Sequence, residues 1–495
     1  MFDALIIGSG LGGLTVAAAL SKEGMNVCVV EKEAKIGGCL RCYRREGVEI
    51  DTGIHYVGSM DDGEILNQYF RYLGIFDKLR IQRLDEEAFD VIRFQGTDYP
   101  FAMGAELFTE RLSTYFPNEK EAIRHYVDLL EKVGRTVGVE QLQQGRISSG
   151  EMDSFYESAW GKICSVTHDK KLQQVLAGNA ILYGGHPDRS SFYLHAMVND
   201  SYLHGAYRFI NGSQQLADAL VEVIQSNGGL IRTSSQVEKL EVKDGVIASV
   251  RLSNGETIAA KRVISSIHPS VLFDMIGETP LLRKALRTRI DSLSNSYGLF
   301  SAVFIQKEKD SAYLNHNIIL HKGNDVWHTA LYPDDTSINQ CMVSMQPQSG
   351  TEEPNHVICM ISPMYFSEVE RWKETSVGKR GERYTQFKQE KADELKGFVE
   401  REFPGLTEGA RLVDCATPLT YRDYTGTPEG AAYGIVKDYH NPLVSIIPVQ
   451  TRIDNLFLVG QNVNLHGALG VTLTSMLACS DILGKEYLAH KISEA

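Results

Sequence analysis

Closely spaced glycines and one carboxylate, Glu31, mark the beginning of the chain. The segment GSGLGG places glycines at positions 8, 10 and 13, and Glu31 follows 23 positions after Gly8. Gly8 permits a tight turn, Gly10 lets the backbone approach a pyrophosphate, and Gly13 lets a helix pack closely on a strand. The Glu31 carboxylate is placed to accept hydrogen bonds from both hydroxyls of a ribose, and it disfavours a 2′-phosphate. These residues predict a site for a dinucleotide without a 2′-phosphate.

The elements that must position these residues form a strand, a helix and a second strand. FDALIIG is an apolar strand, LTVAAALSKEG is an alanine-rich helix closed by Gly24, and NVCVVE is a strand that ends at Glu31. Such a βαβ unit is right-handed by default. Its helix begins near Leu11 and Gly12, where free N–H groups and the positive end of the helix dipole would face phosphate oxygens. GxGxxG alone is a weak signal, but this setting favours dinucleotide binding.

Size and charge limit the other classes of protein. A chain of 495 residues exceeds a single ordinary core and suggests roughly two to three domains. The net charge of −13 gives no overall electrostatic case for binding nucleic acid or an anionic membrane. No apolar run reaches the length of about 18 residues that a membrane span needs. We therefore expect a protein without nucleic-acid partners that is soluble or, at most, attached to a membrane face.

The eight cysteines do not form a disulfide scaffold in a chain of this length. Cys39 and Cys42 form one CLRC, but no second pair at zinc spacing and no thioredoxin-like context accompanies them. This usage predicts reduced, non-catalytic thiols in a cytoplasmic protein and no metal site.

The residues that follow Glu31 suggest which dinucleotide binds. EKEAKIGGCLRCYRREGVEIDTGIHYVG resembles the family of FAD-dependent oxidoreductases that includes phytoene desaturases, carotenoid isomerases and retinol saturases. That family has Glu-Lys after the second strand, then a glycine pair and a DTG loop. The matching positions here are Glu31 and Lys32, Gly37 and Gly38, and Asp51, Thr52 and Gly53. The resemblance therefore implies FAD as the cofactor.

Within this family, GGC together with DTGIHYVG is most similar to the retinol saturase branch. Phytoene desaturases usually have arginine after the glycine pair, where this chain has Cys39. This departure puts in doubt the transfer of a phosphate-binding arginine, for which Arg41 is the candidate replacement.

The C-terminal region supports the same resemblance. Residues 455–484, NLFLVGQNVNLHGALGVTLTSMLACSDILG, resemble the closing flavin motif of the family. An apolar strand at 456–459 ends at Gly460 and Gln461, and a helix is expected to begin near Gly470, followed by Val471 and Thr472. The N-terminus of such a helix could stabilise negative charge on reduced flavin. The alternative is a strand, turn and helix that bind no ligand.

The resemblance also implies how the chain is divided. Segments 207–242 and 261–270 resemble the family's return into and exit from the flavin domain, and Val237 matches a backbone contact to adenine. The implied fold is α/β, of the amine-oxidase and phytoene-desaturase type. It has a discontinuous, Rossmann-like FAD-binding domain and a mixed α+β substrate domain. The FAD-binding domain would span residues 1–75, 205–272 and 410–495, and the substrate domain residues 76–204 and 273–409.

Local patterns predict several further elements. Residues 106–133 form two amphipathic helices interrupted at Pro117. A polar helix is expected from Tyr384 to Glu402. The segment 375–383, TSVGKRGER, is expected to be a solvated loop, although its basic residues leave contact with a membrane or a partner open.

The candidate proton donors are His55, Tyr433 and His466. The resemblance places His55, after the DTG turn, and His466, before the last motif helix, close to the flavin. Tyr433 lies in GAAYG, where small residues would let the backbone approach the ring. For each, a purely structural hydrogen bond is the alternative role. The implied reaction is saturation of a carbon–carbon double bond in an apolar isoprenoid or polyene, by hydride from flavin plus a proton.

Other functions remain open on the sequence alone. A carotenoid desaturase or isomerase would have the same flavin motifs. Rab escort and GDP-dissociation-inhibitor proteins share the architecture but chaperone prenylated partners without redox chemistry. A dehydrogenase that holds NAD at the first fingerprint is a further alternative, although no second GxGxxG appears. The electron donor is not identified by the sequence.

Overall fold

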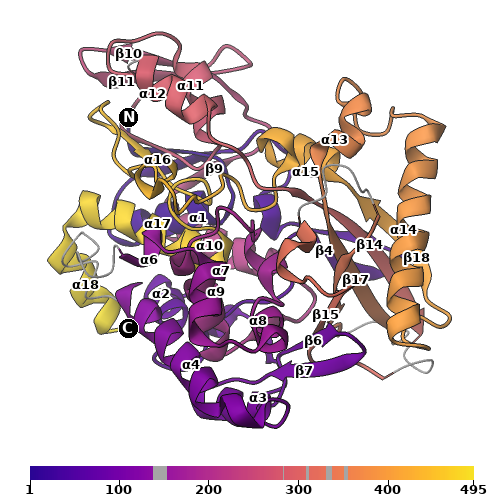
Figure 1. The fold of residues 1–495 in the computed structure, drawn as a ribbon. Coiled ribbons are helices and arrows are strands. Elements are labelled where there is room, and N and C mark those ends of the chain that lie inside the picture. Colours follow the sequence, from indigo (N-terminus) through magenta and orange to yellow (C-terminus); the bar gives the residue numbers. More distant parts are fainter. Residues whose placement is uncertain (138–152, 283, 308–311, 331–336, 350–354) are drawn as a thin grey trace.

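The computed structural model describes residues 1–137, 153–282, 284–307, 312–330, 337–349 and 355–495 (Figure 1). The remaining residues all belong to the predicted substrate domain and lie outside the described part of the chain. Two large sheets and the helices that cover them make up most of the described fold.

A parallel sheet of five strands carries the first predicted motif. Its order is β19-β13-β1-β2-β9, and every neighbouring pair is parallel. The strands are β19 (Leu456–Leu458), β13 (Ala260–Ser265), β1 (Phe2–Ile7), β2 (Val27–Val30) and β9 (Leu230–Arg232). Helix α1 (Leu11–Lys22) connects β1 to β2, so the predicted strand–helix–strand unit is confirmed. The sheet gathers strands from three distant parts of the chain, as a discontinuous domain requires, while the predicted boundaries stay predictions.

Helix α1 packs against both α10 (Gln214–Ser226) and α17 (Gly467–Leu483) beside this sheet. Alanine and glycine allow this close packing, and every residue of α1 from Leu11 to Ser21 is buried. Helix α17 begins at Gly467, so the prediction that it begins near Gly470 is wrong by almost one turn. Gly470 lies inside the helix, where a Cβ would approach that of Leu465 to 2.4 Å. Close packing, and not helix initiation, therefore requires glycine at this position.

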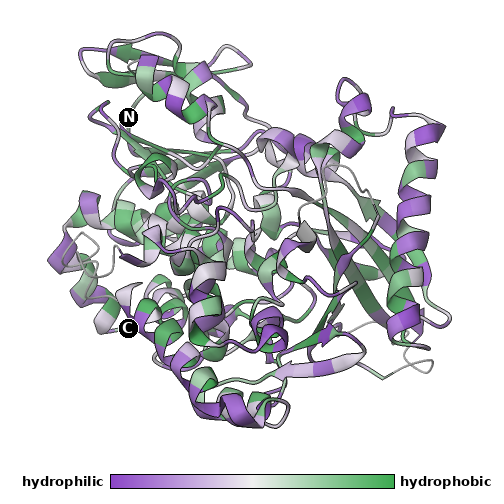
Figure 2. Ribbon diagram, in the orientation of Figure 1, coloured by the Kyte–Doolittle hydropathy of each residue, from purple (hydrophilic) through white to green (hydrophobic). Residues whose placement is uncertain are grey.

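A mostly antiparallel sheet of seven strands forms the second layer. Its order is β18-β14-β17-β16-β15-β6-β7, with one parallel pair, β15 and β6. The strands are β18 (Arg411–Ala416), β14 (Gly298–Lys307), β17 (Asn355–Met364), β16 (Gln340–Gln346), β15 (Asn317–His321), β6 (Asp90–Phe94) and β7 (Thr97–Phe101). Helix α14 (Glu382–Glu402) runs along this sheet and is largely hydrophilic, whereas β14 and β17 are largely hydrophobic (Figure 2). The predicted helix at 384–402 is thus confirmed, with one more half-turn at its start.

Helices form most of the layer between and below the sheets. The two predicted helices around Pro117 are α3 (Ala105–Ser113) and α4 (Lys120–Gly134), separated by a short 3-10 turn at Pro117–Glu119. The others here are α2 (Ile65–Leu73), α6 (Asp153–Tyr156), α7 (Ala159–Val166), α8 (Lys170–Leu176) and α9 (Phe192–Leu203). Helix α4 packs on α9, which leads towards the centre of the molecule (Figure 1).

Smaller elements complete the fold. A three-stranded sheet contains β10 (Val237–Lys243), β11 (Val246–Leu252) and β12 (Thr257–Ile258). Two further sheets have two strands each: β3 (Cys42–Arg45) with β4 (Val48–Asp51), and β5 (Ile81–Arg83) with β8 (Tyr207–Phe209). The remaining helices are α11 (Pro269–Ile276), α12 (Lys284–Asp291), α13 (Phe366–Val369), α15 (Pro418–Thr425), α16 (Pro442–Ser445) and α18 (Lys485–Ser493). Across the described ranges, none of the helices has the length and apolarity to cross a bilayer.

Candidate active site

A cavity of about 480 Å³ lies at the carboxyl ends of the parallel strands. Gly8 follows β1, Glu31 follows β2, Ser266 follows β13 and Gly460 lies just beyond β19, and all four line this first cavity. Ligands of open α/β sheets bind at this edge. Seventeen of the predicted site residues line it: Gly8, Gly10, Leu11, Gly12, Glu31, Lys32, Gly38, Thr52, Gly53, His55, Val237, Tyr433, Gly460, Gln461, His466, Gly470 and Val471.

Four other predicted residues lie behind the wall of the first cavity. A Cβ on Gly13 would lie 2.1 Å from the carbonyl oxygen of Gly8, so Gly13 serves the close packing of helix on strand. Gly37 has a φ of +117° in a turn. The Asp51 carboxylate accepts hydrogen bonds from the backbone N–H and the hydroxyl of Ser213, both at 2.7 Å. Thr472 is buried within α17.

The glycines form a floor of bare backbone in the first cavity. A Cβ on Gly10 would meet no protein atom within 4 Å, whereas one on Gly12 would lie 3.2 Å from Gly460. A Cβ on Gly38 would lie 3.1 Å from the Cα of Gly10. Helix α1 has no side-chain cap at its N-terminus, so its first N–H groups face the cavity unmasked. This arrangement fits a pyrophosphate, because backbone donors converge where no side chain stands.

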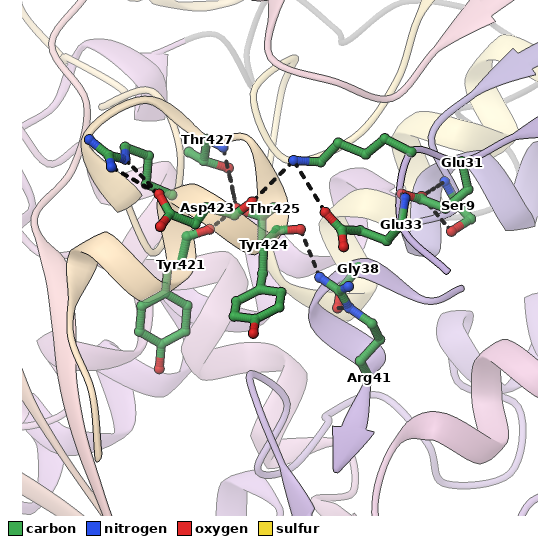
Figure 3. A network of polar contacts seen from close by, with 12 residues as sticks. Ser9, Glu31, Glu33, Gly38, Arg41, Tyr421, Asp423, Tyr424, Thr425 and Thr427 are labelled. Atoms are coloured by element: carbon green, nitrogen blue, oxygen red, sulfur yellow. Dashed lines mark hydrogen bonds and ion pairs between the residues drawn. The ribbon is translucent and has the colours of Figure 1, made fainter. Parts of the chain in front are cut away.

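Glu31 is buried at the rim of this floor and is already partly bonded. One carboxylate oxygen accepts from the N–H of Ser9 at 2.9 Å and from its hydroxyl at 2.6 Å. The other accepts from the N–H of Glu33 at 2.9 Å (Figure 3). Each carboxylate oxygen has two acceptor sites, so the second oxygen retains capacity for a ribose hydroxyl. Ser9 orients the carboxylate, a role that the spacing of the glycines did not reveal.

Two cations next to the floor bond to the end of helix α15. The Lys32 ammonium donates to the carbonyl of Asp423 at 3.1 Å. Arg41 donates from Nε to the carbonyl of Gly38 at 3.0 Å and from Nη2 to that of Tyr424 at 2.7 Å (Figure 3). Cations are favourable at the negative end of a helix dipole. Lys32 and Arg41 thus fasten α15 to the glycine floor, and both also line the first cavity.

Another part of the first cavity is apolar. Its walls there come from α9 and from three strands of the seven-stranded sheet. The apolar lining residues on these elements are Leu194, Met197, Val198, Leu299, Met342 and Ile361. A polar cradle and an apolar chamber therefore belong to one cavity, a combination suited to a dinucleotide beside a hydrophobic substrate.

The three candidate proton donors all line the first cavity, in different electrostatic states. Burial and the Arg208 charge lower the pKa of His55 to about 4. Burial and the charge of Lys437 lower the pKa of His466 to about 3. Burial raises the pKa of Tyr433, whose hydroxyl donates to the carbonyl of Ile181 at 2.5 Å. Both imidazoles are therefore neutral at pH 7, and the phenol proton is already engaged.

Lys437 is a buried lysine that the sequence did not single out. Its three N–H groups donate to the carbonyls of Ser445 at 2.9 Å, Asn462 at 3.1 Å and Val463 at 3.2 Å. Burial lowers the pKa of Lys437 to about 7. These bonds hold the turn that precedes His466 in the wall of the first cavity. Lys437 is followed by polar residues in KDYHN, as an ordinary surface lysine often is. No local signal in the sequence therefore indicated that Lys437 is buried.

A second cavity of about 1170 Å³ adjoins the first. Its walls come from β3, β14, α14, α15 and the segment that leads into α14. The residues that line both cavities are Gly38, Cys39, Arg41, Thr52, Tyr421, Tyr424 and Thr425. The predicted solvated loop at 375–383 contributes to this second cavity, and there the prediction is partly wrong. Only 6% of the Arg380 side chain is exposed, because it forms an ion pair with Asp423 of α15.

The parallel sheet, the glycine floor and the acid after β2 define a dinucleotide-dependent oxidoreductase fold with an attached substrate chamber. The chain belongs to the flavin-containing amine oxidoreductase family, whose sequence profile matches residues 11–482. The cofactor is FAD, as the resemblance at the sequence level implied, and the enzyme is an oxidoreductase. The site residues that would hold FAD stay predictions.

Individual relatives agree with this assignment. Human all-trans-retinol 13,14-reductase is 25% identical over 97% of this chain and 85% of its own length. Prolycopene isomerase 1 from an Oncidium hybrid is 24% identical over 93% of this chain and 80% of its own length. An oxidoreductase from Methanosarcina mazei has the same fold, with a TM-score of 0.66 and 17% identity over 96% of this chain and 99% of its own.

Proposed function

We propose that this protein is an FAD-dependent saturase that reduces a carbon–carbon double bond of an apolar isoprenoid or polyene. The observation that carries the proposal is the single cavity that joins a bare glycine floor to an apolar chamber lined from α9 and the seven-stranded sheet. The name of the human relative, a retinol reductase, supports a polyene as the substrate and reduction as the direction.

The residues of this chain would divide the work as follows. Gly10, Gly12 and the N-terminus of α1 bind the pyrophosphate, and Glu31 binds the ribose. Bound reduced FAD would supply hydride to one carbon of the double bond. The apolar walls hold the substrate and exclude water from the reacting carbons. A proton for the second carbon would pass through Nε2 of His55 or of His466, the two neutral imidazoles of the cavity.

Anaerobic single-turnover experiments test the reaction. The purified holoenzyme is reduced chemically and mixed with all-trans-retinol without oxygen. We expect the flavin absorbance of the oxidised form to return while the polyene absorbance shifts to shorter wavelength, because conjugation is lost. Longer-wavelength polyene absorbance on mixing with oxidised enzyme would instead identify a desaturase.

Isomerisation is a second candidate, favoured by the prolycopene isomerase relative. An isomerase needs reduced flavin but transfers no net electrons. The same experiment separates it from a saturase, since a cis-polyene would change geometry while the flavin stays reduced.

A binding protein without redox chemistry is the remaining alternative. It would explain the apolar chamber but not the glycine floor with its acid. The enzyme proposal would be contradicted if the purified protein is colourless and shows no flavin absorbance after incubation with FAD.

Two exposed apolar side chains support peripheral contact with a membrane face. Val377 is 46% exposed and Tyr424 is 43% exposed, and both line the mouth of the second cavity beside the exposed Lys379 and Arg383. An isoprenoid substrate dissolves in the bilayer, where such a mouth would collect it. We expect flotation with phosphatidylcholine–phosphatidylserine vesicles to weaken in Val377→Asp. Leu230→Asp is the matched control, because Leu230 is 45% exposed on β9 and lines neither cavity.

A further inference from the structure

The second cavity has the walls of a site for an extended apolar molecule. Four tyrosine rings line it, those of Tyr43, Tyr384, Tyr421 and Tyr424, together with Val303 of β14. Charged side chains line this cavity as well, among them Arg45, Lys388 and Asp414. The tyrosines and the valine give it an aromatic and aliphatic part of the kind that is typical of small-molecule sites. Its volume of about 1170 Å³ exceeds the roughly 480 Å³ of the first cavity. The first cavity must also accommodate FAD, so an extended substrate needs further space.

The residues that line both cavities come mainly from the short turn around Cys39 and from helix α15, and they form the partition between the cavities. Cys39 lines both cavities and has exposed surface, yet the surrounding protein raises the pKa of its thiol. The thiol is therefore enclosed by the protein but faces open space. Arg41 and Tyr424 close the partition next to it, through the hydrogen bond of 2.7 Å and a guanidinium that lies 5.5 Å from the tyrosine ring (Figure 3).

The outer mouth of the second cavity is a fixed structure. Arg380, in the segment before α14, is nearly inaccessible and forms an ion pair with Asp423 of α15. The adjacent Val377 and Gly378 line the cavity, and Val377 is exposed to solvent as well. This side of the second cavity therefore lies between the segment before α14 and helix α15.

We propose that the second cavity binds the distal part of an elongated isoprenoid chain whose reacting double bond lies in the first cavity. This inference rests on the proposed function and adds a length requirement to it. The chain passes the partition at Cys39, Tyr421 and Tyr424, and its far end lies among Tyr43, Val303 and Tyr384. Chains short enough to fit in the first cavity make no use of this space. Longer chains gain affinity from it, because the burial of apolar surface away from water is favourable.

Filling the second cavity tests the proposal. Ala416 is half-buried at the end of β18 and lines only the second cavity, so Ala416→Trp narrows it without touching the first. Binding of geraniol and of geranylgeraniol to oxidised holoenzyme is followed by the change in flavin absorbance, which needs no turnover. We expect Ala416→Trp to weaken geranylgeraniol binding by at least about tenfold while geraniol binding stays within about twofold of wild type.

A matched variant and the wild type complete the comparison. Ala105→Trp replaces a half-buried alanine at the start of α3 that lines neither cavity, and it should bind both alcohols normally. Equal effects of Ala416→Trp on the two alcohols, or no effect, would overturn the role of the second cavity but leave the proposed function standing. Wild-type enzyme that contains FAD and binds neither alcohol nor retinol would overturn the proposed function as well.

Thiol labelling of the wild-type enzyme is an independent test, which applies even if Ala416→Trp folds poorly. Cys39 and the half-exposed Cys164 are modified with a small maleimide, and each site is quantified by mass spectrometry. We expect saturating geranylgeraniol to slow labelling of Cys39 at least about fivefold and geraniol to leave it unchanged, with Cys164 unaffected by both. If geranylgeraniol binds but leaves the labelling rate of Cys39 unchanged, the proposed path of the chain is contradicted.

Discussion

The imidazole of His466 lies against the phenol ring of Tyr433, with ring centroids 4.9 Å apart and planes inclined by 56°. The two side chains belong to different segments: Tyr433 lies in the GAAYG turn, and His466 is the residue before α17. Their polar atoms differ in state. The Tyr433 hydroxyl donates to the carbonyl of Ile181, whereas Nε2 of His466 meets no hydrogen-bond partner among the described residues. In this pair the phenol proton of Tyr433 is already used in a hydrogen bond, whereas Nε2 of His466 is available to a ligand.

Tyr433→Phe separates the structural role of this residue from a catalytic one. The ring contact with His466 remains, but the buried carbonyl of Ile181 loses its donor. We expect the free energy of unfolding in urea to fall by about 1 kcal/mol, with the rate of double-bond reduction close to that of wild type. A rate lower by two orders of magnitude at normal flavin content would instead make the Tyr433 hydroxyl the proton source.

His55→Gln tests the first candidate for proton delivery. Glutamine keeps a hydrogen-bonding side chain but cannot exchange a proton as imidazole does. We expect reoxidation of the reduced flavin by retinol to slow by about 100-fold or more, the usual size of a general acid–base contribution. Bound flavin content and reduction by dithionite should stay unchanged and are the controls. Reoxidation by retinol at the wild-type rate would mean that His55 has only a structural role. His466 would then be the remaining candidate for proton delivery.

Gly10→Ala and Gly13→Ala distinguish two uses of glycine within one motif. The new Cβ at Gly10 meets no protein atom within 4 Å, and the φ of −68° suits alanine. The unliganded protein should therefore be as stable as wild type or up to about 1 kcal/mol more stable. The methyl group occupies the phosphate approach, so the affinity for FAD should fall by about tenfold or more. Equilibrium titration of the apoprotein with FAD measures this loss.

Gly13→Ala should impair folding itself, before FAD can bind. Its Cβ would lie 2.1 Å from the carbonyl oxygen of Gly8, which is backbone and cannot move aside without shifting α1 from β1. We expect little soluble protein, or a strongly lowered midpoint of thermal unfolding without FAD. Similar stability of the two alanine variants would contradict the different roles of the two glycines.

His204 gives the stability of the protein a defined dependence on pH. Hydrogen bonds to Asp200 and Glu64 raise the pKa of His204 from 6.5 to about 10 in the folded state. A raised pKa in the folded state stabilises the protein fully below pH 6.5, and this contribution is lost as pH rises towards 10. We expect His204→Gln to lower the free energy of unfolding more at pH 6 than at pH 9, as measured in urea. The exposed His125 of α4 provides the matched variant His125→Gln, which should show a smaller difference between the two pH values.

The local parts of the fold were predictable because their signals are local. Glycine spacing, apolar runs and the acid at Glu31 lie within about thirty residues, and β1, α1 and β2 form as those patterns indicate. The break at Pro117 and helix α14 follow in the same way from backbone chemistry and charge. The beginning of α17 was misplaced, because Gly470 has the appearance of a helix start but is required by contact with Leu465. That contact depends on packing within the folded chain.

The sequence by itself determined the dinucleotide motif, the family resemblance and the residue types from which a flavin site is built. Only the tertiary structure decided which of those residues face one cavity, that Arg380 is buried against Asp423, and that Lys437 donates to the carbonyls of Ser445, Asn462 and Val463. The physical reason is that a motif depends on backbone conformations set by near neighbours. Burial, pKa and cavity walls depend instead on residues that are not neighbours in the chain and meet only when the sheets and helices have packed.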